Sequence, residues 1–275
     1  MSLSLPRTIR PFVCGWMVGF SFDYSIIHSL ENLTWKSLTW KSLIGERPTV
    51  FKQHTGEVKG LSLQPCGDYF VSCAKDNTWS FYDISSARVL QTFNAGLDST
   101  FENSHSYLDG TLNAIQYHPD GLIMATGVST GTIQVWDMNS RSVVTEFNEH
   151  QDSISAIAFS ENGYYMASSG EEGVVKIWDL RKGSCLQSLE MGSPVHSVAF
   201  DYSGCYLAAG ASDLRIMNTK TWETVYRNEE DVNGFYGLSF GQDAGYLYSG
   251  CGNRSVVKLS CSFVCFSYEV GCFNK

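Results

Sequence analysis

Residues 159–179 read FSENGYYMASSGEEGVVKIWD, and this stretch decides the fold. It contains the end of one apolar strand, a turn at Gly163, a second strand, another turn, and a third strand that ends at Trp178 and Asp179. Short apolar runs that alternate with polar residues and are separated by glycine turns indicate antiparallel β-hairpins. No segment keeps a helical period over a long window between helix start and stop signals. An all-β fold is therefore predicted.

The same pattern recurs along the chain as an internal repeat. Each repeat opens with an apolar triplet at positions i, i+3 and i+5, and a turn glycine follows. The glycines are spaced 54, 42, 41 and 41 residues apart, which is typical of one four-stranded propeller blade per repeat, with an insertion of about twelve residues within 94–110. The triplets are Val58, Leu61, Leu63; Leu112, Ile115, Tyr117; Ile154, Ile157, Phe159; Val195, Val198, Phe200; and Phe235, Leu238, Phe240, and the glycines are Gly67, Gly121, Gly163, Gly204 and Gly245.

Polar residues at fixed places in the repeats predict the hydrogen-bonded signature of a WD blade, named for its Trp-Asp pair. We interpret them as a loop histidine, a strand hydroxyl, a turn carboxylate and an aromatic donor that satisfy one another inside the blade, where an unpaired polar group costs about 1–3 kcal/mol. The residues are His54, Ser72, Asp76, Tyr82 and Asp83 in the first repeat, Trp136 and Asp137 in the second, and His150, Ser168, Glu172, Trp178 and Asp179 in the third.

The other positions of the signature are degraded. The fourth and fifth repeats have Met217-Asn218 and Leu259-Ser260 in place of Trp-Asp. The histidine position holds Leu108, Met191 or Asp231, and the carboxylate position holds Thr130, Ala211 or Asn253, with Asp213 as a substitute in the fourth repeat.

His54, Asp76 and Ser72 also have the residue types of a catalytic triad. The structural interpretation is preferred because the same types recur one period away, which a single active site does not require.

The sequence has no phosphate loop, zinc-protease helix, nucleophile elbow or kinase signature, and no convergent carboxylates or histidines for a site in a central channel. Cys261, Cys265 and Cys272 cluster without a CxxC pair or a nearby histidine. We predict no catalytic, cofactor-binding or metal-binding residues.

Composition narrows the classes of partner. The 275 residues are 43% hydrophobic and 17% charged, with a formal net charge of −9. This acidic balance argues against direct nucleic-acid binding, which relies on lysine and arginine. No apolar run reaches the roughly 18 residues of a membrane-spanning helix. The nine cysteines are mostly scattered singly, which favours a reducing compartment.

Four phrases carry a family resemblance: DYFVSCAKDNTWSFYD (residues 68–83), YHPDGLIMATG (117–127), FSENGYYMASS (159–169) and VVKIWDLRKG (174–183). In this order they resemble the C-terminal WD domain of the pre-mRNA-processing factor 19 family of spliceosome-associated U-box ubiquitin ligases. The resemblance implies a nuclear scaffold that joins the spliceosome, presents partners or substrates for ubiquitination, and takes part in DNA-damage repair. Family members act as transferases through an N-terminal U-box, tetramerise through a coiled coil, and carry seven blades.

This sequence departs from that pattern at both ends. We expect an atypical segment at 1–50, five blades at about 51–93, 108–147, 148–189, 190–229 and 230–260, and an atypical tail at 261–275. The U-box and the coiled coil find no match in it, so the chain resembles a truncated member. Blades bury their faces only against neighbours, so an incomplete or open ring is predicted.

Two hypotheses of function follow. The leading one is a non-catalytic scaffold that binds spliceosomal proteins and ubiquitination substrates, and that gives a blank autoubiquitination assay when tested alone. The alternative is a generic WD-repeat adaptor, or a truncated remnant, with no role in splicing. The loops that carry His54, Asp98 and His150 are candidate sites of partner contact, chosen only from their places in the repeats.

Overall fold

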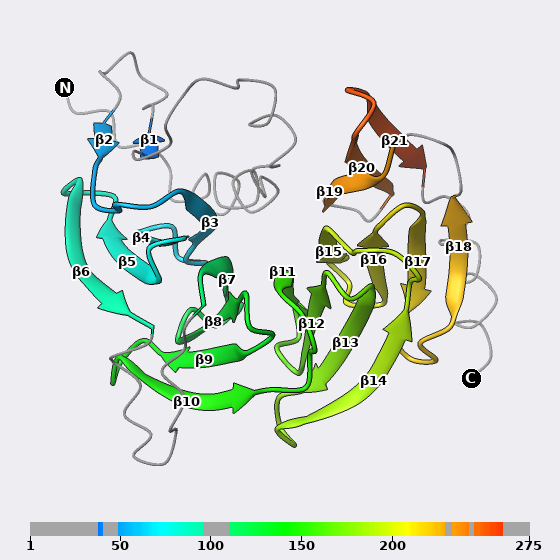
Figure 1. The fold of residues 1–275 in the computed structure, drawn as a ribbon, viewed down its shortest axis with the longest axis horizontal. Coiled ribbons are helices and arrows are strands. Elements are labelled where there is room, and N and C mark those ends of the chain that lie inside the picture. Colours follow the sequence, from blue (N-terminus) through cyan, green and yellow to red (C-terminus); the bar gives the residue numbers. More distant parts are fainter. Residues whose placement is uncertain (1–37, 41–48, 96–109, 229–232, 242–244, 261–275) are drawn as a thin grey trace, which may run out of the picture.

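The computed structural model describes residues 38–40, 49–95, 110–228, 233–241 and 245–260 (Figure 1). Within these ranges every regular element is a β-strand, and all the strand pairings are antiparallel. The strands form four sheets of four strands, one of three and one of two. The predicted all-β, incomplete propeller with an open ring is confirmed.

The five larger sheets follow one another in chain order, and each is built from consecutive strands. The first sheet contains β3 Val58–Leu63, β4 Tyr69–Ala74, β5 Thr78–Asp83 and β6 Arg88–Asn94, and the second contains β7 Leu112–Tyr117, β8 Ile123–Val128, β9 Ile133–Asp137 and β10 Ser142–Phe147. The third contains β11 Ile154–Phe159, β12 Tyr165–Gly170, β13 Val174–Asp179 and β14 Ser184–Glu190, and the fourth contains β15 Ser197–Phe200, β16 Tyr206–Gly210, β17 Leu214–Asn218 and β18 Thr224–Asn228. The fifth contains β19 Phe235–Phe240, β20 Tyr246–Cys251 and β21 Val256–Ser260.

The sheets stand side by side in an arc (Figure 1). The first strands of consecutive sheets, β3, β7, β11, β15 and β19, contact one another along the inner edge of the arc. The first and fifth sheets lie at the two ends of the arc and face each other across its opening. Each interior sheet therefore has two neighbours, and each end sheet has one neighbour among these five.

A two-stranded sheet precedes the first large sheet. It pairs β1 Leu38–Trp40 with β2 Thr49–Phe51, and Leu38 lies opposite Phe51. The Phe51 ring packs against Phe70 and Tyr82, with centroids 5.6 and 5.0 Å apart. This two-stranded sheet lies largely within residues 1–50, where the sequence showed no match to a blade. The insertion expected within 94–110 lies mostly outside the described residues.

The core lies at the interfaces between sheets. Trp79, Trp136 and Trp178 are fully buried, each on the third strand of its sheet. Trp79 stacks on Phe93 at 4.1 Å and meets the edge of Trp136, in the next sheet, at 5.2 Å. A buried tryptophan removes about 150–250 Å² of surface from water, so these rings dominate the packing between neighbouring sheets.

Close packing also requires small residues at these interfaces. A Cβ atom built on Gly127 of β8 would lie 2.5 Å from Cγ2 of Ile154 in the next sheet. A Cβ atom on Gly241, in contrast, would meet its nearest neighbour at 3.6 Å, which is ordinary contact. Gly127 is thus needed for the approach of β8 to β11, and Gly241 is not.

We predict that Gly127→Ala lowers the free energy of unfolding by about 1–3 kcal/mol, because the added methyl group overpacks the interface. Urea denaturation followed by tryptophan fluorescence measures this change. Gly241→Ala is the matched control and is expected to stay within about 0.5 kcal/mol. Equal losses in the two variants would contradict this account of the interface.

Candidate functional site

The third sheet contains a continuous hydrogen-bond chain from a tryptophan to a carboxylate. Trp178 Nε1 donates to Ser168 Oγ over 2.8 Å, and Ser168 Oγ lies 2.7 Å from His150 Nε2. His150 Nδ1 lies 2.5 Å from Glu172 Oε1, whose second oxygen accepts from the backbone N–H of Gln151 over 2.8 Å. A neutral imidazole protonated on Nδ1 satisfies every group in this chain.

The first sheet has the same arrangement with one additional hydroxyl group. His54 Nε2 lies 2.6 Å from Ser72 Oγ, which lies 3.0 Å from the Tyr82 hydroxyl. On the other side of the ring, Thr78 Oγ1 lies 2.9 Å from His54 Nδ1 and donates to Asp76 Oδ1 over 2.6 Å. The direct distance from His54 Nδ1 to Asp76 is 3.5 Å. Asp76 is one methylene shorter than Glu172, so the Thr78 hydroxyl fills the space between ring and carboxylate.

The second and fourth sheets have no histidine at this position. In the second sheet Trp136 Nε1 donates to Thr126 Oγ1 over 3.0 Å. In the fourth, Asp213 Oδ2 accepts from Arg215 Nε at 2.9 Å and from Arg227 Nε at 2.6 Å. Arg215 also donates to the carbonyls of Glu190 and Met191, each over 2.9 Å. Asp213 therefore holds an arginine, not a histidine, against the loop that enters its sheet.

Sequence reasoning did not identify Thr78, Arg215 or Arg227. Thr78 follows the turn carboxylate Asp76 by two residues, and Arg215 follows Asp213 by two, so each carboxylate lies just before the strand that carries its partner. This spacing of two residues is the feature of the sequence from which Thr78 and Arg215 could have been identified.

The residue at the aspartate position of each Trp-Asp pair, or of its equivalent, caps the turn between the third and fourth strands of a sheet. The side-chain oxygens of Asp83, Asp137, Asp179 and Asn218 each accept from the backbone N–H two residues later, over 2.8, 3.1, 3.0 and 2.8 Å. The residue four positions after each cap has a positive φ: 53° at Ala87, 57° at Arg141, 61° at Gly183 and 58° at Trp222. All four complete sheets therefore use one turn geometry.

Burial determines the protonation of the two histidines. It lowers the pKa of His150 and of His54, and the neighbouring carboxylates Glu172 and Asp76 only partly oppose this effect. Burial would raise the pKa of Asp76, but hydrogen bonds from Thr78, Gly56 and Thr55 outweigh it and lower the pKa to about 2. Buried, neutral and fully hydrogen-bonded, these histidines fit a structural role better than a catalytic one.

We predict that His150→Met destabilises the protein, because it leaves Ser168 and Glu172 short of a partner at about 1–3 kcal/mol for each buried group. Met191 occupies the equivalent position in the fourth sheet, and its replacement by leucine is the control, expected to cost less than about 1.5 kcal/mol.

The loss of stability caused by His150→Met is also expected to depend on pH. The pKa of His150 in the folded protein lies below its value of about 6.5 in the unfolded chain. The contribution of His150 to the free energy of unfolding is therefore full above pH 6.5 and declines as the pH falls below it. The difference between wild type and His150→Met should therefore shrink from pH 7.5 to 5.5 in urea denaturation. A difference that is constant with pH would count against the neutral, buried histidine.

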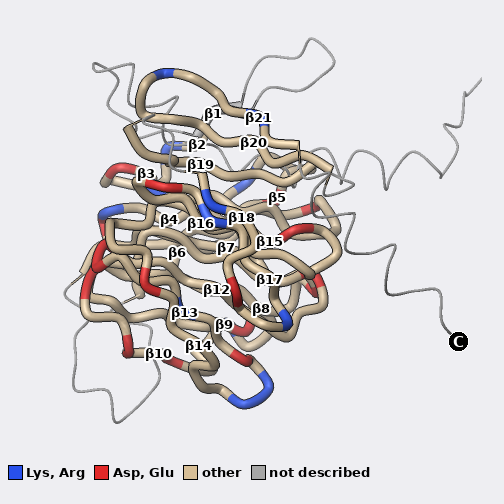
Figure 2. The backbone as a smooth tube through the Cα atoms, turned by 90° about the vertical axis from the view of Figure 1, so that its right-hand side faces the viewer, with Lys and Arg blue, Asp and Glu red and all other residues tan. Residues whose placement is uncertain are grey.

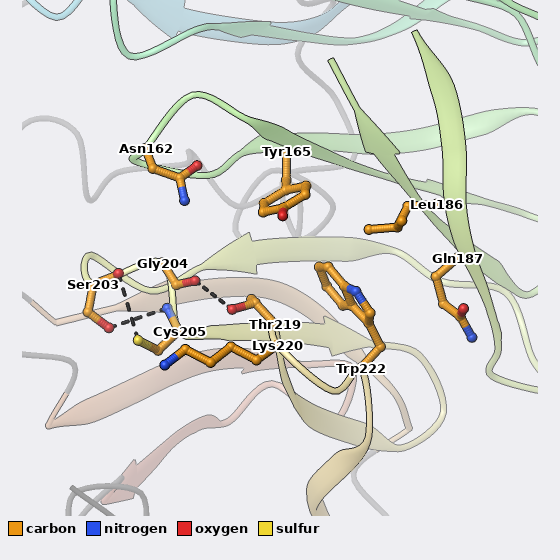
Figure 3. Close-up of a pocket in the computed structure, with 10 residues that line it drawn as sticks. All are labelled: Asn162, Tyr165, Leu186, Gln187, Ser203, Gly204, Cys205, Thr219, Lys220 and Trp222. Carbon is orange, nitrogen blue, oxygen red and sulfur yellow. Dashed lines mark hydrogen bonds between the residues drawn. The ribbon is translucent and has the colours of Figure 1, made fainter. Parts of the chain in front are cut away.

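A pocket of about 600 Å³ lies where the turns of the third and fourth sheets meet (Figure 3). Tyr165 lines it from the third sheet and Trp222 from the turn between β17 and β18. The two rings meet edge to face with centroids 5.9 Å apart. Thr219 Oγ1 donates to the Gly204 carbonyl over 2.7 Å, which joins two turns of the floor. The other lining residues are Asn162, Leu186, Gln187, Ser203, Cys205 and Lys220.

Positive charge lies beside this pocket. The Arg181 guanidinium lies over the Tyr164 ring at 4.6 Å and near the Tyr165 ring at 5.9 Å, and it pairs with Asp179 at 3.0 Å. Lys182 and Lys220 are exposed in the same group of turns. The pocket thus combines aromatic surface with cations on an acidic protein, an arrangement suited to an apolar side chain flanked by negative charge.

In the described part of the chain, no group of three or more histidine, cysteine, aspartate or glutamate residues has a metal-binding arrangement. Among these residues, no helix is long and apolar enough to cross a bilayer. The cluster Cys261, Cys265 and Cys272, together with Leu108, Asp231 and the guessed contact Asp98, lies outside the described residues.

Comparison with known proteins places the repeats in a family. Residues 47–238 match the family model described as the nucleolar protein 10-like N-terminal domain. The chain is similar to pre-mRNA-processing factor 19 of Bos taurus, with 41% identity over 209 residues, or 75% of this chain and 40% of that protein. It is similar to the protein of the same name from Oryza sativa subsp. japonica, with 36% identity over 213 residues, 74% of this chain and 38% of that protein. The matched region thus spans about two fifths of the length of these relatives.

Proposed function

We propose that this chain, which belongs to the family of nucleolar protein 10-like N-terminal β-propeller domains, is a non-catalytic protein-interaction scaffold in pre-mRNA processing. The name and the identity of the pre-mRNA-processing factor 19 relatives support the process. We also propose a nuclear location and, from the resemblance of the repeats to the WD domain of this family, the finer role of presenting partners for ubiquitination and DNA repair. Function resides in sites and not in folds, so the binding role depends on the surface of this chain.

The pocket between the third and fourth sheets is the observation that carries the binding role. The buried histidines of the signature already make their hydrogen bonds inside their own sheets, so they are not available to a partner. Tyr165, Trp222 and Lys220, in contrast, line a pocket on the surface. A hollow of about 600 Å³ has room for one or two side chains of a bound segment. Tryptophan, tyrosine and arginine are also the residues that most often dominate binding energy.

The backbone at Trp222 supports a role for its side chain. Its φ of 58° lies in the left-handed region, where a bulky residue is an outlier and costs on the order of 1–3 kcal/mol. Gly183 occupies the equivalent turn position in the third sheet, where the same conformation carries no such cost. A tryptophan held at a position that favours glycine suggests that its ring is needed in the pocket.

We predict that Trp222→Gly lowers the recovery of splicing components at least tenfold in affinity purification from nuclear extract, because it removes the aromatic wall of the pocket. The melting temperature should fall by only a few degrees, since relief of backbone strain offsets part of the packing that Trp222 loses against Tyr165 and against the apolar cluster between the third and fourth sheets.

Arg141→Gly is the matched control, since Arg141 has the same turn position, a φ of 57° and no part in the pocket. It should leave recovery unchanged. Failure of the wild-type chain to recover any splicing component would contradict the proposed process. Equal recovery by wild type and Trp222→Gly would contradict the proposed site.

A further inference from the structure

The fourth strand of each complete sheet has an irregularity at the same place. The register between the third and fourth strands shifts there, so that the fourth strand has one extra residue without a partner opposite it. Such a β-bulge bends the strand and re-aims the extra side chain. The extra residues are all apolar, and they are between 41% and 53% exposed: Leu90, Val144, Leu186 and Val225. Each complete sheet therefore presents one apolar side chain on its outermost strand.

A turn of the following sheet determines what lies beside each bulge. In the second sheet the turn residue with positive φ is Arg141, and its guanidinium donates to the side chain of Gln91 in the first sheet. In the third sheet this residue is Gly183, and a Cβ atom built on it would meet nothing within 4 Å. In the fourth sheet it is Trp222, which lines the pocket together with Leu186. Of these three turns, the one with Trp222 thus adds an aromatic wall to the bulge of the preceding sheet.

The charge on the wall of this pocket is positive. Lys220 is the one charged residue among those that line the pocket, and it is exposed on a chain of net charge −9. Its side chain points away from the Trp222 ring (Figure 3). The pocket therefore has an apolar end, with Leu186 and Trp222, and a polar end with a cation.

Further cations lie on the neighbouring turn. Basic residues colour the turn between β13 and β14, at the lower edge of Figure 2. Arg181 in this turn is paired with Asp179 at 3.0 Å, whereas Lys182 lies 3.9 Å from the same carboxylate and is more exposed. A single strand of nucleic acid needs several cations along a groove as well as aromatic rings. One lysine on the wall fits a short acidic segment of protein better.

We propose that this pocket selects an acidic segment of a partner protein in which a large apolar or aromatic side chain lies close to a carboxylate. This inference rests on the proposed role of the chain as a protein-binding scaffold. The apolar anchor would pack between Leu186 and Trp222, and the carboxylate would face Lys220. The anchor supplies most of the affinity because it leaves water, and the carboxylate supplies preference, since water screens an exposed ion pair.

Fluorescence anisotropy of the whole chain with three labelled eight-residue peptides tests the proposal. The first peptide has one phenylalanine and two glutamates in a glycine-serine background, the second has lysine for each glutamate, and the third has alanine for phenylalanine. The first peptide should bind the wild type most tightly. Leu186→Ser should weaken its binding about tenfold, because the anchor loses one apolar wall. Lys220→Glu should weaken it as well and favour the lysine peptide.

The first sheet provides a matched control for each variant. Leu90→Ser makes the same change at the equivalent bulge, where Leu90 is 47% exposed and Leu186 is 41% exposed. Arg88→Glu reverses an exposed charge away from the pocket. Each control should alter binding by less than about threefold, because solvent and salt screen a distant charge. Thermal melts check folding, and the preference of Lys220→Glu for the lysine peptide is a gain that an unfolded chain would not show.

Three results would overturn the proposal. Equal losses in Leu186→Ser and Leu90→Ser would show that the anchor does not use the pocket. Equal binding of the acidic and lysine peptides would remove the preference for negative charge. Displacement of the acidic peptide by a ten-nucleotide poly-uridine would identify the pocket as a nucleic-acid surface instead.

The outcome is distinguishable from that of the proposed function. If none of the three peptides binds, while Trp222→Gly still lowers the recovery of splicing components from nuclear extract, this inference fails and the proposed function stands. If the acidic peptide binds as expected, while the wild-type chain recovers no splicing component, the chemistry of the pocket stands and the proposed process fails.

Discussion

Contact between neighbouring sheets is the constraint on which the rest of this structure depends. The apolar residues divide into clusters that mostly span two consecutive sheets, and no single centre gathers them. Trp79 and Trp136 meet across one such interface, and Gly127 allows the backbone of β8 to approach Ile154 across another. A blade buries its faces only against its neighbours, so each sheet's stability depends on the sheet beside it.

The features that could be predicted from the sequence are those that repeat. The turn glycines and apolar triplets recur at a nearly constant interval, so the number and order of the sheets followed from periodicity. The structure places His54 beside Ser72 and Asp76, and His150 beside Ser168 and Glu172, within single sheets. Recurrence of the same residue types one period apart was enough to expect both groups.

The features that could not be predicted depend on one sheet or on contacts between sheets. Arg215 crosses from the fourth sheet to carbonyls of the preceding loop, and no other repeat has an arginine in that role. Trp222 meets Tyr165 from a different sheet, and nothing in the spacing of the two residues indicates contact. Such features leave no periodic signal, although they distinguish this propeller from others with the same repeats.

The arc in Figure 1 has ends, and a closed ring has none. In a ring, loosening one blade disturbs two interfaces wherever it occurs, so the ring tends to open as a whole. In an arc, an end sheet can separate by losing one interface, and the interior sheets remain paired. The five larger sheets therefore resemble a short linear array, with stability graded from its middle toward both ends.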